Sequence, residues 1–474
     1  MTKQKIIIVG GGITGLAAAH RLQKIAPQSQ ITLLEQSDRL GGKIFTERLD
    51  GFLIEGGADS FLSRKPRGTG LCEELSLGSR LQGRNPDHQK TYVMGQGELH
   101  RLPEGMTGLV PTNLDALINN TLISAAGRER LAQEADIPPS QDDSDESIAD
   151  FMIRRLGHEV YTQLVEPLMS GIYAGDGAQL SLLATFPQMR QLERKHGSLL
   201  NGLEQSQSNS INPVSPTYPP FVTLPKGMGE LVDAMVDELT EVDIRLGAGV
   251  AKVEASGNGY QVTLTDGETC LGDGLILTTP AYVNSRVLQT LDPDLAEAHA
   301  AIPYVSTAII TLAYAVEDVE TEFFLENSVS RPLDGYGYVI PRSEDSDVLA
   351  CTWTSSKWVG RAPAGYALLR VYVGRYGRSD VLQLSDDKLV QMAQTELANT
   401  LQITATPHLQ RIYRWPQAMP QYTLGHLDRL AQIDARLEHH PGLLLAGAAY
   451  RGVGIPDCIA AGEAAAQAVI GYHE

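Results

Sequence analysis

The sequence has few cysteines, a deficit of positive charge and no long hydrophobic run, and each of these excludes a class of protein. Its 474 residues include 4 Cys without a CxxC pair, so neither a zinc site nor a disulfide framework is predicted, and a reducing cytoplasm is the default location. The 38 Lys and Arg face 57 Asp and Glu, a net charge of −19. This charge argues against nucleic acid as a partner and against electrostatic docking on anionic lipid.

The longest apolar stretch, Val305–Val316, is interrupted by Ser306, Thr307 and Thr311. It is shorter than the roughly 18 residues that span a bilayer, and we predict a buried strand there instead. The N-terminus becomes glycine-rich too soon for a signal peptide, so neither a targeting nor a transmembrane segment is expected. Apolar residues make up 42% of the chain, enough for a sizeable core. Its length suggests about three structural units at roughly 150 residues each.

The sequence at the start of the chain predicts a βαβ unit. The β-branched run 5–9 predicts a buried strand, residues 16–25 predict a helix, and residues 31–34 predict a second strand. Between the first strand and the helix lies the sequence Gly10-Gly-Gly-Ile-Thr-Gly15. Glu35 follows the second strand, 20 residues after the last of these glycines. This order of elements predicts a dinucleotide site.

Each part of this pattern has a physical role in such a site. Gly10 allows a tight turn, Gly12 lets the backbone approach a pyrophosphate, and Gly15 lets the helix pack on the strand. The helix N-terminus offers free N–H groups and a positive dipole end to the phosphates. Glu35 can accept ribose hydroxyls and disfavours a 2′-phosphorylated cofactor. These residues alone leave NAD and FAD open.

A second glycine pair favours FAD. The stretch Asp38-Arg-Leu-Gly-Gly-Lys-Ile44 resembles the RxGG segment of the flavin amine oxidase superfamily, with Lys43 as its basic member. Leu271–Pro280 and Leu443–Gly447 are similar to the middle and late segments with which that family completes its FAD site. The resemblance therefore implies FAD, bound by segments from the start, middle and end of the chain.

The C-terminal sequence narrows the resemblance. Gly447–Ile459, with a helix expected to begin near Pro456, looks like the signature of the protoporphyrinogen oxidases and their coproporphyrinogen-oxidising relatives. Ala448-Ala-Tyr450 stand where monoamine oxidases carry a flavin-linking cysteine, so non-covalent FAD is implied. Cys458 is interpreted as a packing residue.

Three further segments fit the same family: Gly51–Phe61, Leu224–Gly229 and Trp415–Tyr422. The resemblance thus covers nearly the whole chain. The cofactor-binding residues that the glycine motif and the resemblance imply are Gly10, Gly11, Gly12, Ile13, Thr14, Gly15, Glu35, Gln36, Gly42, Lys43, Gly57, Ala58, Asp59, Ser60, Val250, Trp415, Gly447, Val453, Gly454 and Ile455.

The predicted fold is α/β, with a discontinuous Rossmann-like FAD-binding domain on a parallel sheet, an α+β substrate domain and a mainly helical subdomain. Within the helical subdomain, the acidic, proline-bearing stretch 134–146 is expected to be an exposed loop. The predicted boundaries are 1–75, 222–295 and 435–474 for the FAD-binding domain, 76–112 and 296–434 for the substrate domain, and 113–221 for the helical subdomain.

The resemblance implies a six-electron oxidation of a porphyrinogen in haem biosynthesis, with dioxygen as acceptor and release of peroxide. We predict coproporphyrinogen III as the substrate, because it is the more water-soluble choice and the chain is acidic without an apolar anchor. Arg64, Lys65 and Arg67 are predicted to pair with its propionates, with a solvated basic turn as the alternative.

The sequence leaves three alternatives open. Protoporphyrinogen IX is the alternative substrate, a flavin amine oxidase or desaturase is the alternative enzyme, and a non-catalytic haem-pathway binding protein is a third possibility. No side chain is assigned as a catalyst, and no metal is predicted. Transient contact with neighbouring haem-pathway enzymes and weak peripheral membrane contact are compatible with the sequence.

Overall fold

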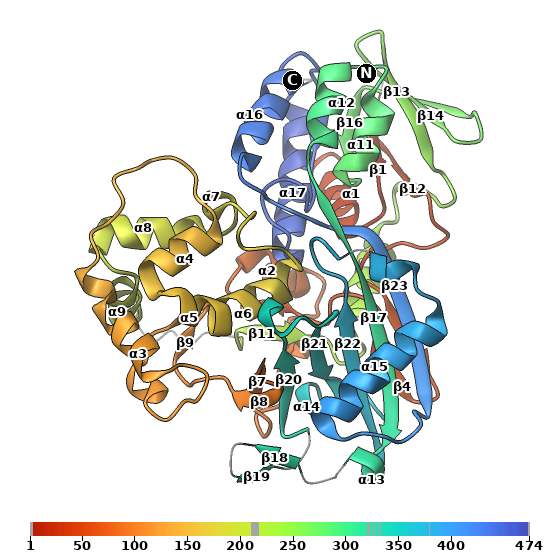
Figure 1. Cartoon of the computed structure of the whole chain (residues 1–474). Coiled ribbons are helices and arrows are strands. Elements are labelled where there is room, and N and C mark those ends of the chain that lie inside the picture. Colours follow the sequence, from red (N-terminus) through yellow and green to blue (C-terminus); the bar gives the residue numbers. More distant parts are fainter. Residues whose placement is uncertain are drawn as a thin grey trace.

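The computed structural model describes residues 3–209, 218–319, 323–325, 328–330, 333–378 and 380–472. Figure 1 shows three parts: a sheet with helices near the two termini, a second sheet below it, and a lobe of helices to one side. This arrangement confirms the predicted fold class. The predicted domain boundaries remain predictions.

The first part is a five-stranded parallel sheet with the order β12-β2-β1-β16-β24. Its register places Lys5 opposite Gln30, and Ile6 opposite both Ile31 and Gly274. The strands come from three separate stretches of the chain, so the sheet is discontinuous in sequence as predicted. The strands are β1 (Lys5–Val9), β2 (Gln30–Leu34), β12 (Val242–Arg245), β16 (Gly274–Leu277) and β24 (Leu443–Leu445).

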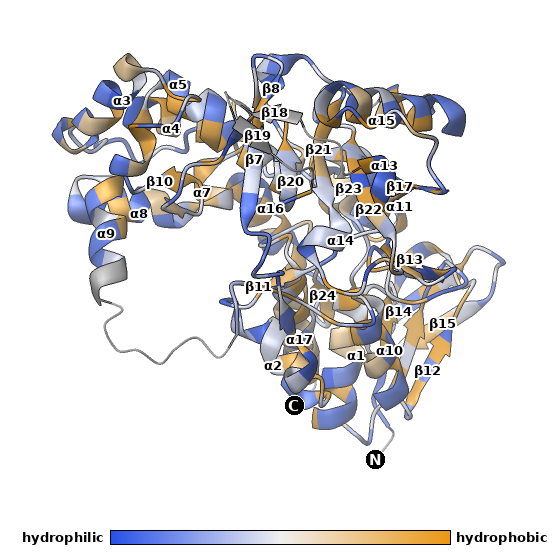
Figure 2. Ribbon diagram, turned by 90° about the horizontal axis from the view of Figure 1, so that it is seen from below, coloured by the Kyte–Doolittle hydropathy of each residue, from blue (hydrophilic) through white to orange (hydrophobic). Residues whose placement is uncertain are grey.

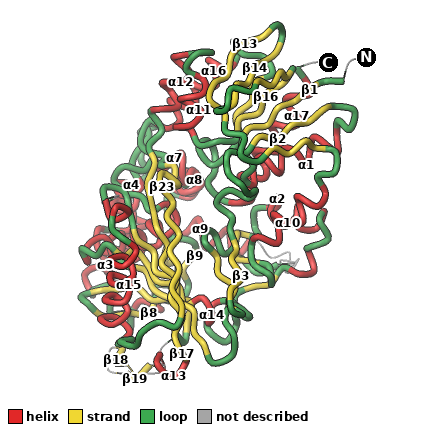
Figure 3. Tube along the Cα trace, turned by 90° about the vertical axis from the view of Figure 1, so that its right-hand side faces the viewer, coloured by secondary structure: helices red, strands yellow, loops and turns green. Residues whose placement is uncertain are grey.

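Both faces of this sheet are covered, because alternate side chains of each strand enter different cores. Ile6 and Ile8 pack on one face with helices α1 and α17, whereas Ile7 and Val9 face the opposite core. Figure 3 shows the helices beside the strands of this sheet. The helices of the first face are α1 (Ile13–Ile25), α2 (Pro66–Glu74), α10 (Gly229–Glu238) and α17 (Ile455–Gly471). The other face carries α11 (Ala281–Leu288), α12 (Pro293–Ala300), α16 (His426–Leu437) and the three-stranded sheet of β13 (Val250–Ser256), β14 (Gly259–Leu264) and β15 (Thr269–Gly272).

The second part is a seven-stranded mixed sheet with the order β23-β17-β22-β21-β20-β7-β8, and we call it the substrate sheet. Helix α15 (Asp386–Leu401) covers one of its faces. The buried strand predicted at 305–316 is confirmed as β17 (Tyr304–Ala315). The other strands are β7 (Lys90–Gly95), β8 (Glu98–Arg101), β20 (Gly335–Val339), β21 (Val348–Trp353), β22 (Tyr366–Val373) and β23 (Leu409–Pro420).

The third part is a lobe of short helices, which confirms a mainly helical subdomain. Figure 2 shows hydrophobic and hydrophilic residues on the same ribbons here, as expected for helices that pack around a core of their own. The helices are α3 (Ala125–Ala132), α4 (Ile148–Leu156), α5 (His158–Val160), α6 (Glu166–Tyr173), α7 (Leu182–Thr185), α8 (Pro187–His196) and α9 (Leu199–Asn209), with a π-helical turn at Tyr161–Val165. Among the described residues, no helix combines the length and apolar character needed to cross a membrane.

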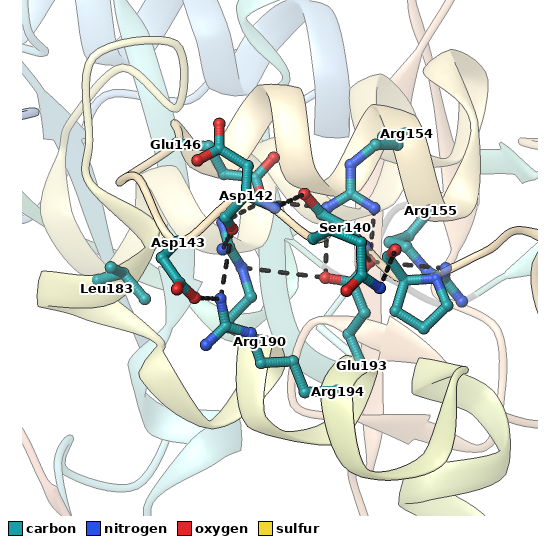
Figure 4. A network of polar contacts seen from close by, with 12 residues as sticks. Ser140, Asp142, Asp143, Glu146, Arg154, Arg155, Leu183, Arg190, Glu193 and Arg194 are labelled. Atoms are coloured by element: carbon teal, nitrogen blue, oxygen red, sulfur yellow. Dashed lines mark hydrogen bonds and ion pairs between the residues drawn. The ribbon is translucent and has the colours of Figure 1, made fainter.

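The prediction of an exposed loop at 134–146 is wrong for its first residue. Glu134 is 0% exposed and accepts a hydrogen bond from Arg155 Nε at 2.6 Å. Arg155 lies on α4, Glu193 on α8, and both are fully buried as well. Buried ion pairs, shown in part in Figure 4, therefore fix this segment to the lobe.

Candidate functional site

The glycine turn after β1 has the geometry that a dinucleotide requires. Gly10 has a φ of +104°, a conformation that L side chains rarely adopt. A Cβ at Gly15 would lie 1.9 Å from the Gly10 carbonyl oxygen, so only glycine lets α1 pack this closely on the strand. A Cβ at Gly12 would meet nothing within 4 Å, and Gly12 caps α1 without a side-chain hydrogen bond. Space beside Gly12 is therefore open at the start of α1, where Ile13 is half-buried and Thr14 is buried.

Glu35 lies at the end of β2, directly beside this turn. Its carboxylate accepts hydrogen bonds from the Gly11 N–H at 2.6 Å and from the Ser37 N–H at 2.9 Å. Its backbone accepts from Ala248 N–H at 2.8 Å, which brings the turn before Val250 to the same edge. Gln36 and Gly249 are also neighbours, because a Cβ at Gly249 would lie 3.6 Å from Gln36 Cβ. The structure therefore brings the predicted ribose and adenine residues together.

The second glycine pair lies against the first glycine turn. Gly41 donates its N–H to the Gly11 carbonyl at 2.8 Å and forms a parallel bridge with Gly12. Gly42 has a φ of +57°, and its added Cβ would approach Gly12 Cα to 3.1 Å. Arg39 donates to the Gly42 carbonyl at 2.7 Å and so holds this turn from inside. Arg39 is the first residue of the RxGG motif, and no role is predicted for it from the sequence.

Lys43 and Trp415 bring the start and the late part of the chain together. Lys43 Nζ donates to the Ala418 carbonyl, and Trp415 Nε1 donates to the Gly56 carbonyl at 2.6 Å. A Cβ at Gly57 would lie 1.9 Å from the Lys43 carbonyl oxygen, so this approach also requires glycine. Lys43 is exposed to solvent, but the protein atoms around it displace part of its surrounding water, and this desolvation lowers its pKa.

The C-terminal segment completes the same edge. Gly447, with a φ of +123°, follows β24, and its added Cβ would lie 3.5 Å from the carbonyl oxygen of Thr278, the residue after β16. Tyr422 Oη donates to the Ala448 carbonyl at 2.7 Å and accepts from the Gly452 N–H at 2.8 Å, which fixes the loop between them. This loop leads through Val453 to α17, whose N-cap is Gly454 and whose first residue is Ile455. The helix begins one residue from the predicted position.

The turns at Gly10–Gly15, Gly41–Gly42 and Gly447 lie at one edge of the parallel sheet, which we call the glycine edge. The segment Gly57–Ser60 joins this edge to the substrate sheet. Asp59 Oδ2 accepts from Lys357 Nζ at 2.8 Å and from Trp358 Nε1 at 3.0 Å, and Ser60 Oγ donates to Asp59 Oδ1 at 2.8 Å. Arg370 Nη1 lies 3.5 Å from Asp59 Oδ2. Burial opposes ionisation of Asp59, but Lys357 and Arg370 outweigh it and hold the pKa of this carboxyl well below its usual range.

Ala58 lies beside Asp59 in this segment and is exposed. Ala58 and Asp59 are predicted from the sequence, but the two cations beside Asp59 are not. Lys357 and Arg370 lie about 300 residues further along the chain, and no motif marks them.

The three basic residues predicted to bind propionates lie at the start of α2. Lys65 Nζ forms an ion pair with Asp457 at 2.5 Å, and Arg67 pairs with Glu463 and Glu74. Arg64 is exposed, and no carboxylate of the described chain lies within ion-pair distance of it. Carboxylates of the protein itself therefore neutralise two of these three cations.

Burial shifts the pKa of two groups that could carry chemistry. His426 is fully buried, stacks on Tyr422 with ring centroids 4.2 Å apart, and burial lowers its pKa to about 4. Cys458 is buried, and this burial raises the pKa of its thiol to about 11, as expected for a packing residue. The described part of the chain contains no group of three or more His, Cys, Asp or Glu that could hold a metal ion.

The residues at this edge fit a dinucleotide cofactor. Close backbone approaches demand glycine at Gly15 and Gly57, and a positive φ favours it at Gly10. Open space lies beside Gly12 at the start of α1, and a carboxylate stands at the end of β2. The arrangement also places a charged cluster of the substrate sheet next to the segment that continues from this edge.

Comparison with known proteins gives consistent results. The profile of the flavin containing amine oxidoreductase family matches residues 13–470. The chain is 36% identical to a coproporphyrinogen III oxidase of Bacillus subtilis over 477 aligned residues, which cover 99% of this chain and 98% of that protein. It is 33% identical to a chloroplastic protoporphyrinogen oxidase of Spinacia oleracea, covering 98% and 84% of the two chains. A putative protoporphyrinogen oxidase from Exiguobacterium has a solved structure with a TM-score of 0.85, 32% identity and 99% coverage of both chains.

Proposed function

The chain belongs to the flavin containing amine oxidoreductase family, and we propose that it is an FAD-dependent oxidase that converts coproporphyrinogen III to coproporphyrin III with dioxygen as acceptor. The observation that carries the proposal is the 36% identity to a coproporphyrinogen III oxidase over nearly the full length of both chains. Coproporphyrinogen III oxidases of Staphylococcus aureus and Propionibacterium freudenreichii, at 33% and 32% identity, support the same substrate.

The fit of the glycine edge supports non-covalent FAD. The Gly10–Gly12 turn and the start of α1 would hold the diphosphate, Glu35 would accept ribose hydroxyls, and Val250 would lie beside the adenine. The start of α17 at Gly454 would direct its N–H groups toward the flavin ring. When bound, the flavin supplies an acceptor for the electrons of the substrate. No cysteine stands in the loop 447–454 for a covalent link.

In this proposal, side chains of the protein hold the site in shape, and none of them is assigned a proton transfer. Trp415 and Lys43 fix strand β23 against the Gly56–Gly57 backbone, and Tyr422 fixes the loop before α17. These contacts hold the walls of the site rigid, which is how geometry alone contributes to a rate. No His or Glu of the site is assigned as a base.

An anaerobic mixing experiment tests the substrate. Purified yellow protein is mixed without oxygen with coproporphyrinogen III, protoporphyrinogen IX or an amine, and the visible flavin absorption is followed. We expect fastest bleaching with coproporphyrinogen III. Faster bleaching with protoporphyrinogen IX would favour the alternative substrate, which the similarity to plant protoporphyrinogen oxidases supports. Bleaching by the amine alone would contradict a porphyrinogen oxidase.

The other parts of the assignment remain predictions from the sequence. They are the three domain boundaries, the cytoplasmic location, transient contacts with neighbouring enzymes of the pathway, and weak peripheral contact with a membrane. The binding of propionates by Arg64, Lys65 and Arg67 also remains a prediction, and the ion pairs of Lys65 and Arg67 compete with it.

A further inference from the structure

Arg370 is an unusual residue in the substrate sheet, because it is buried and incompletely bonded. Its side chain is 1% exposed, yet its Nε and Nη1 have no hydrogen-bond partner among the residues that the structure describes. Its Nη2 donates to the Gly57 carbonyl, which places the guanidinium between β22 and the segment that continues from the glycine edge. A buried guanidinium normally has all its N–H groups satisfied, since an unmade hydrogen bond in a dry site is expensive.

The surroundings of Arg370 hold more positive than negative charge. Lys357 and Arg370 lie 2.8 and 3.5 Å from Asp59, and Arg361 lies 3.8 Å from Glu55. Arg84 is the neighbour of Asn85, whose N–H donates to the Lys357 carbonyl at 2.9 Å. Four cations therefore face two carboxylates. Glu230 also acts on Arg361, but it is paired with Arg80 at 2.5 Å. In a low-dielectric region, two cations without matching carboxylates favour the entry of an anion.

Solvent reaches this cluster, so a ligand can reach it too. Lys357 is 17% exposed and Asp59 is 11% exposed, although both lie beside the buried Arg370. Arg84 is partly exposed and lies against the rings of Phe221 and Tyr336, at 4.9 and 4.4 Å from their centroids. These aromatic rings hold the Arg84 guanidinium without neutralising its charge.

We propose that Arg370, Lys357 and Arg84 form a carboxylate-binding site of the substrate region, and that it receives a propionate of the porphyrinogen. This inference rests on the proposed function. The free edge of a guanidinium suits a carboxylate, because two parallel N–H donors match its two oxygens. The site differs from the one predicted at Arg64–Arg67, where protein carboxylates already pair with two of the cations.

The sheet itself supplies a matched control. Thr311 on β17 is the register partner of Arg370 on β22 and also of Arg411 on β23, so the two arginines flank the same residue. Arg411 Nε already pairs with Glu47 at 2.9 Å. Arg411→Gln therefore removes an arginine from the same row of the sheet without removing an unmatched charge.

The test measures binding of coproporphyrin III and of its uncharged tetramethyl ester to the purified holoprotein by porphyrin fluorescence. Arg370→Gln is expected to weaken binding of the acid by about tenfold to a hundredfold, the range for losing a charged hydrogen bond, and to leave the ester unchanged. Arg370→Lys, which keeps the charge, should retain most of the preference for the acid. Arg411→Gln should change either affinity by no more than about twofold. If Arg370→Gln does not fold, Lys357→Met, at a more exposed position, replaces it. This variant should also bind the acid more weakly and the ester equally well.

A second variant gives a result of opposite sign. Asp59→Asn removes the carboxylate that partly neutralises Lys357 and Arg370, so the acid should bind several-fold more tightly while the ester does not. A purely structural role of Asp59 would give weaker binding of both porphyrins.

The inference is overturned if Arg370→Gln and Lys357→Met weaken the acid and the ester equally or not at all, or if Asp59→Asn weakens the acid. If the wild-type protein oxidises coproporphyrinogen III while these results are obtained, only the carboxylate site is wrong. If the wild-type protein neither binds coproporphyrin III nor oxidises any porphyrinogen, the proposed function fails together with the inference.

Discussion

Buried arginines occur in two regions of the molecule, and the regions treat them in opposite ways. In the helical lobe, the buried Arg155 and Arg190 and the partly exposed Arg154 form a set of ion pairs with Glu134, Glu146 and Glu193. Figure 4 labels these residues except Glu134. Cations and carboxylates are equal in number there. Beside the substrate sheet, the four cations Arg370, Lys357, Arg361 and Arg84 outnumber the two carboxylates Asp59 and Glu55.

The difference between the two regions indicates what a buried charge contributes to the protein in each of them. A matched network ties segments together, as when Glu134 accepts the N–H of Leu199 at 2.9 Å and so fixes the start of α9 to the pair with Arg155. An unmatched cation gains nothing comparable from its own chain, and Arg370 has one hydrogen bond and a 3.5 Å approach to Asp59. We therefore expect matched arginines to control stability and unmatched arginines to control binding.

The largest expected effect on stability is in the lobe. Glu134→Gln leaves the fully buried Arg155 with backbone carbonyls and, as its one carboxylate partner among the described residues, Glu193 at 3.6 Å. The change should lower the free energy of unfolding by about 3–5 kcal/mol. The relative affinity for coproporphyrin III and its ester should not change. Urea denaturation of the holoprotein measures the first quantity, and a loss below about 1 kcal/mol would mean that the network is not what holds the lobe.

A smaller effect on stability is expected at the substrate sheet, although the effect on binding is large. Arg370→Met gives up the hydrogen bond to Gly57 but also removes an unmatched buried cation, so the free energy of unfolding should change by less than about 2 kcal/mol. The same denaturation measurement applies. A loss as large as that of Glu134→Gln would show that Arg370 is a structural residue and would erase the contrast between the two regions.

The two carboxylates beside the substrate sheet should respond to pH differently. Lys357 and Arg370 lower the pKa of Asp59 against the effect of burial, so its contribution to stability is present above the ordinary carboxyl pKa and is lost as pH falls through the lowered one. The stability difference between wild type and Asp59→Asn should therefore be constant from about pH 7 to about pH 5, because both states are ionised there.

Glu55 should behave in the opposite way. Burial raises its pKa more than Arg361 lowers it, so the folded state holds the proton more tightly than the unfolded state. Stability then falls as pH rises from the ordinary pKa through the raised one, and the Glu55→Gln variant lacks this slope. Denaturation midpoints at several pH values measure both differences. Parallel pH profiles for the two variants would contradict the assignment of the cations to Asp59.

Local features of this site could be predicted from the sequence, and long-range charge pairing could not. The turn at Gly10–Gly15 and the acid at Glu35 are fixed by neighbours in the chain, so their roles follow from spacing. Arg370 stands in a strand between apolar residues, and only the folded sheet brings it to Gly57. Glu134 lies in a stretch whose acidic, proline-bearing composition predicts exposure, and its burial depends on Arg155, 21 residues further along the chain.

The smallest expected effect on the free energy of unfolding is at an exposed ion pair. It distinguishes the contribution of buried charges from the contribution of the connected network. Arg194 pairs with Asp143 at the rim of the lobe's ion pairs (Figure 4), and the two side chains are 45% and 87% exposed. Solvent screens such a pair, so Arg194→Gln should change the free energy of unfolding by less than about 1 kcal/mol. The pair belongs to the same set of contacts as Glu134, yet neither of its charges has left water. If Arg194→Gln destabilised the protein as much as Glu134→Gln, the stability of the lobe would depend on the connected network as a whole rather than on matched charges in its dry interior.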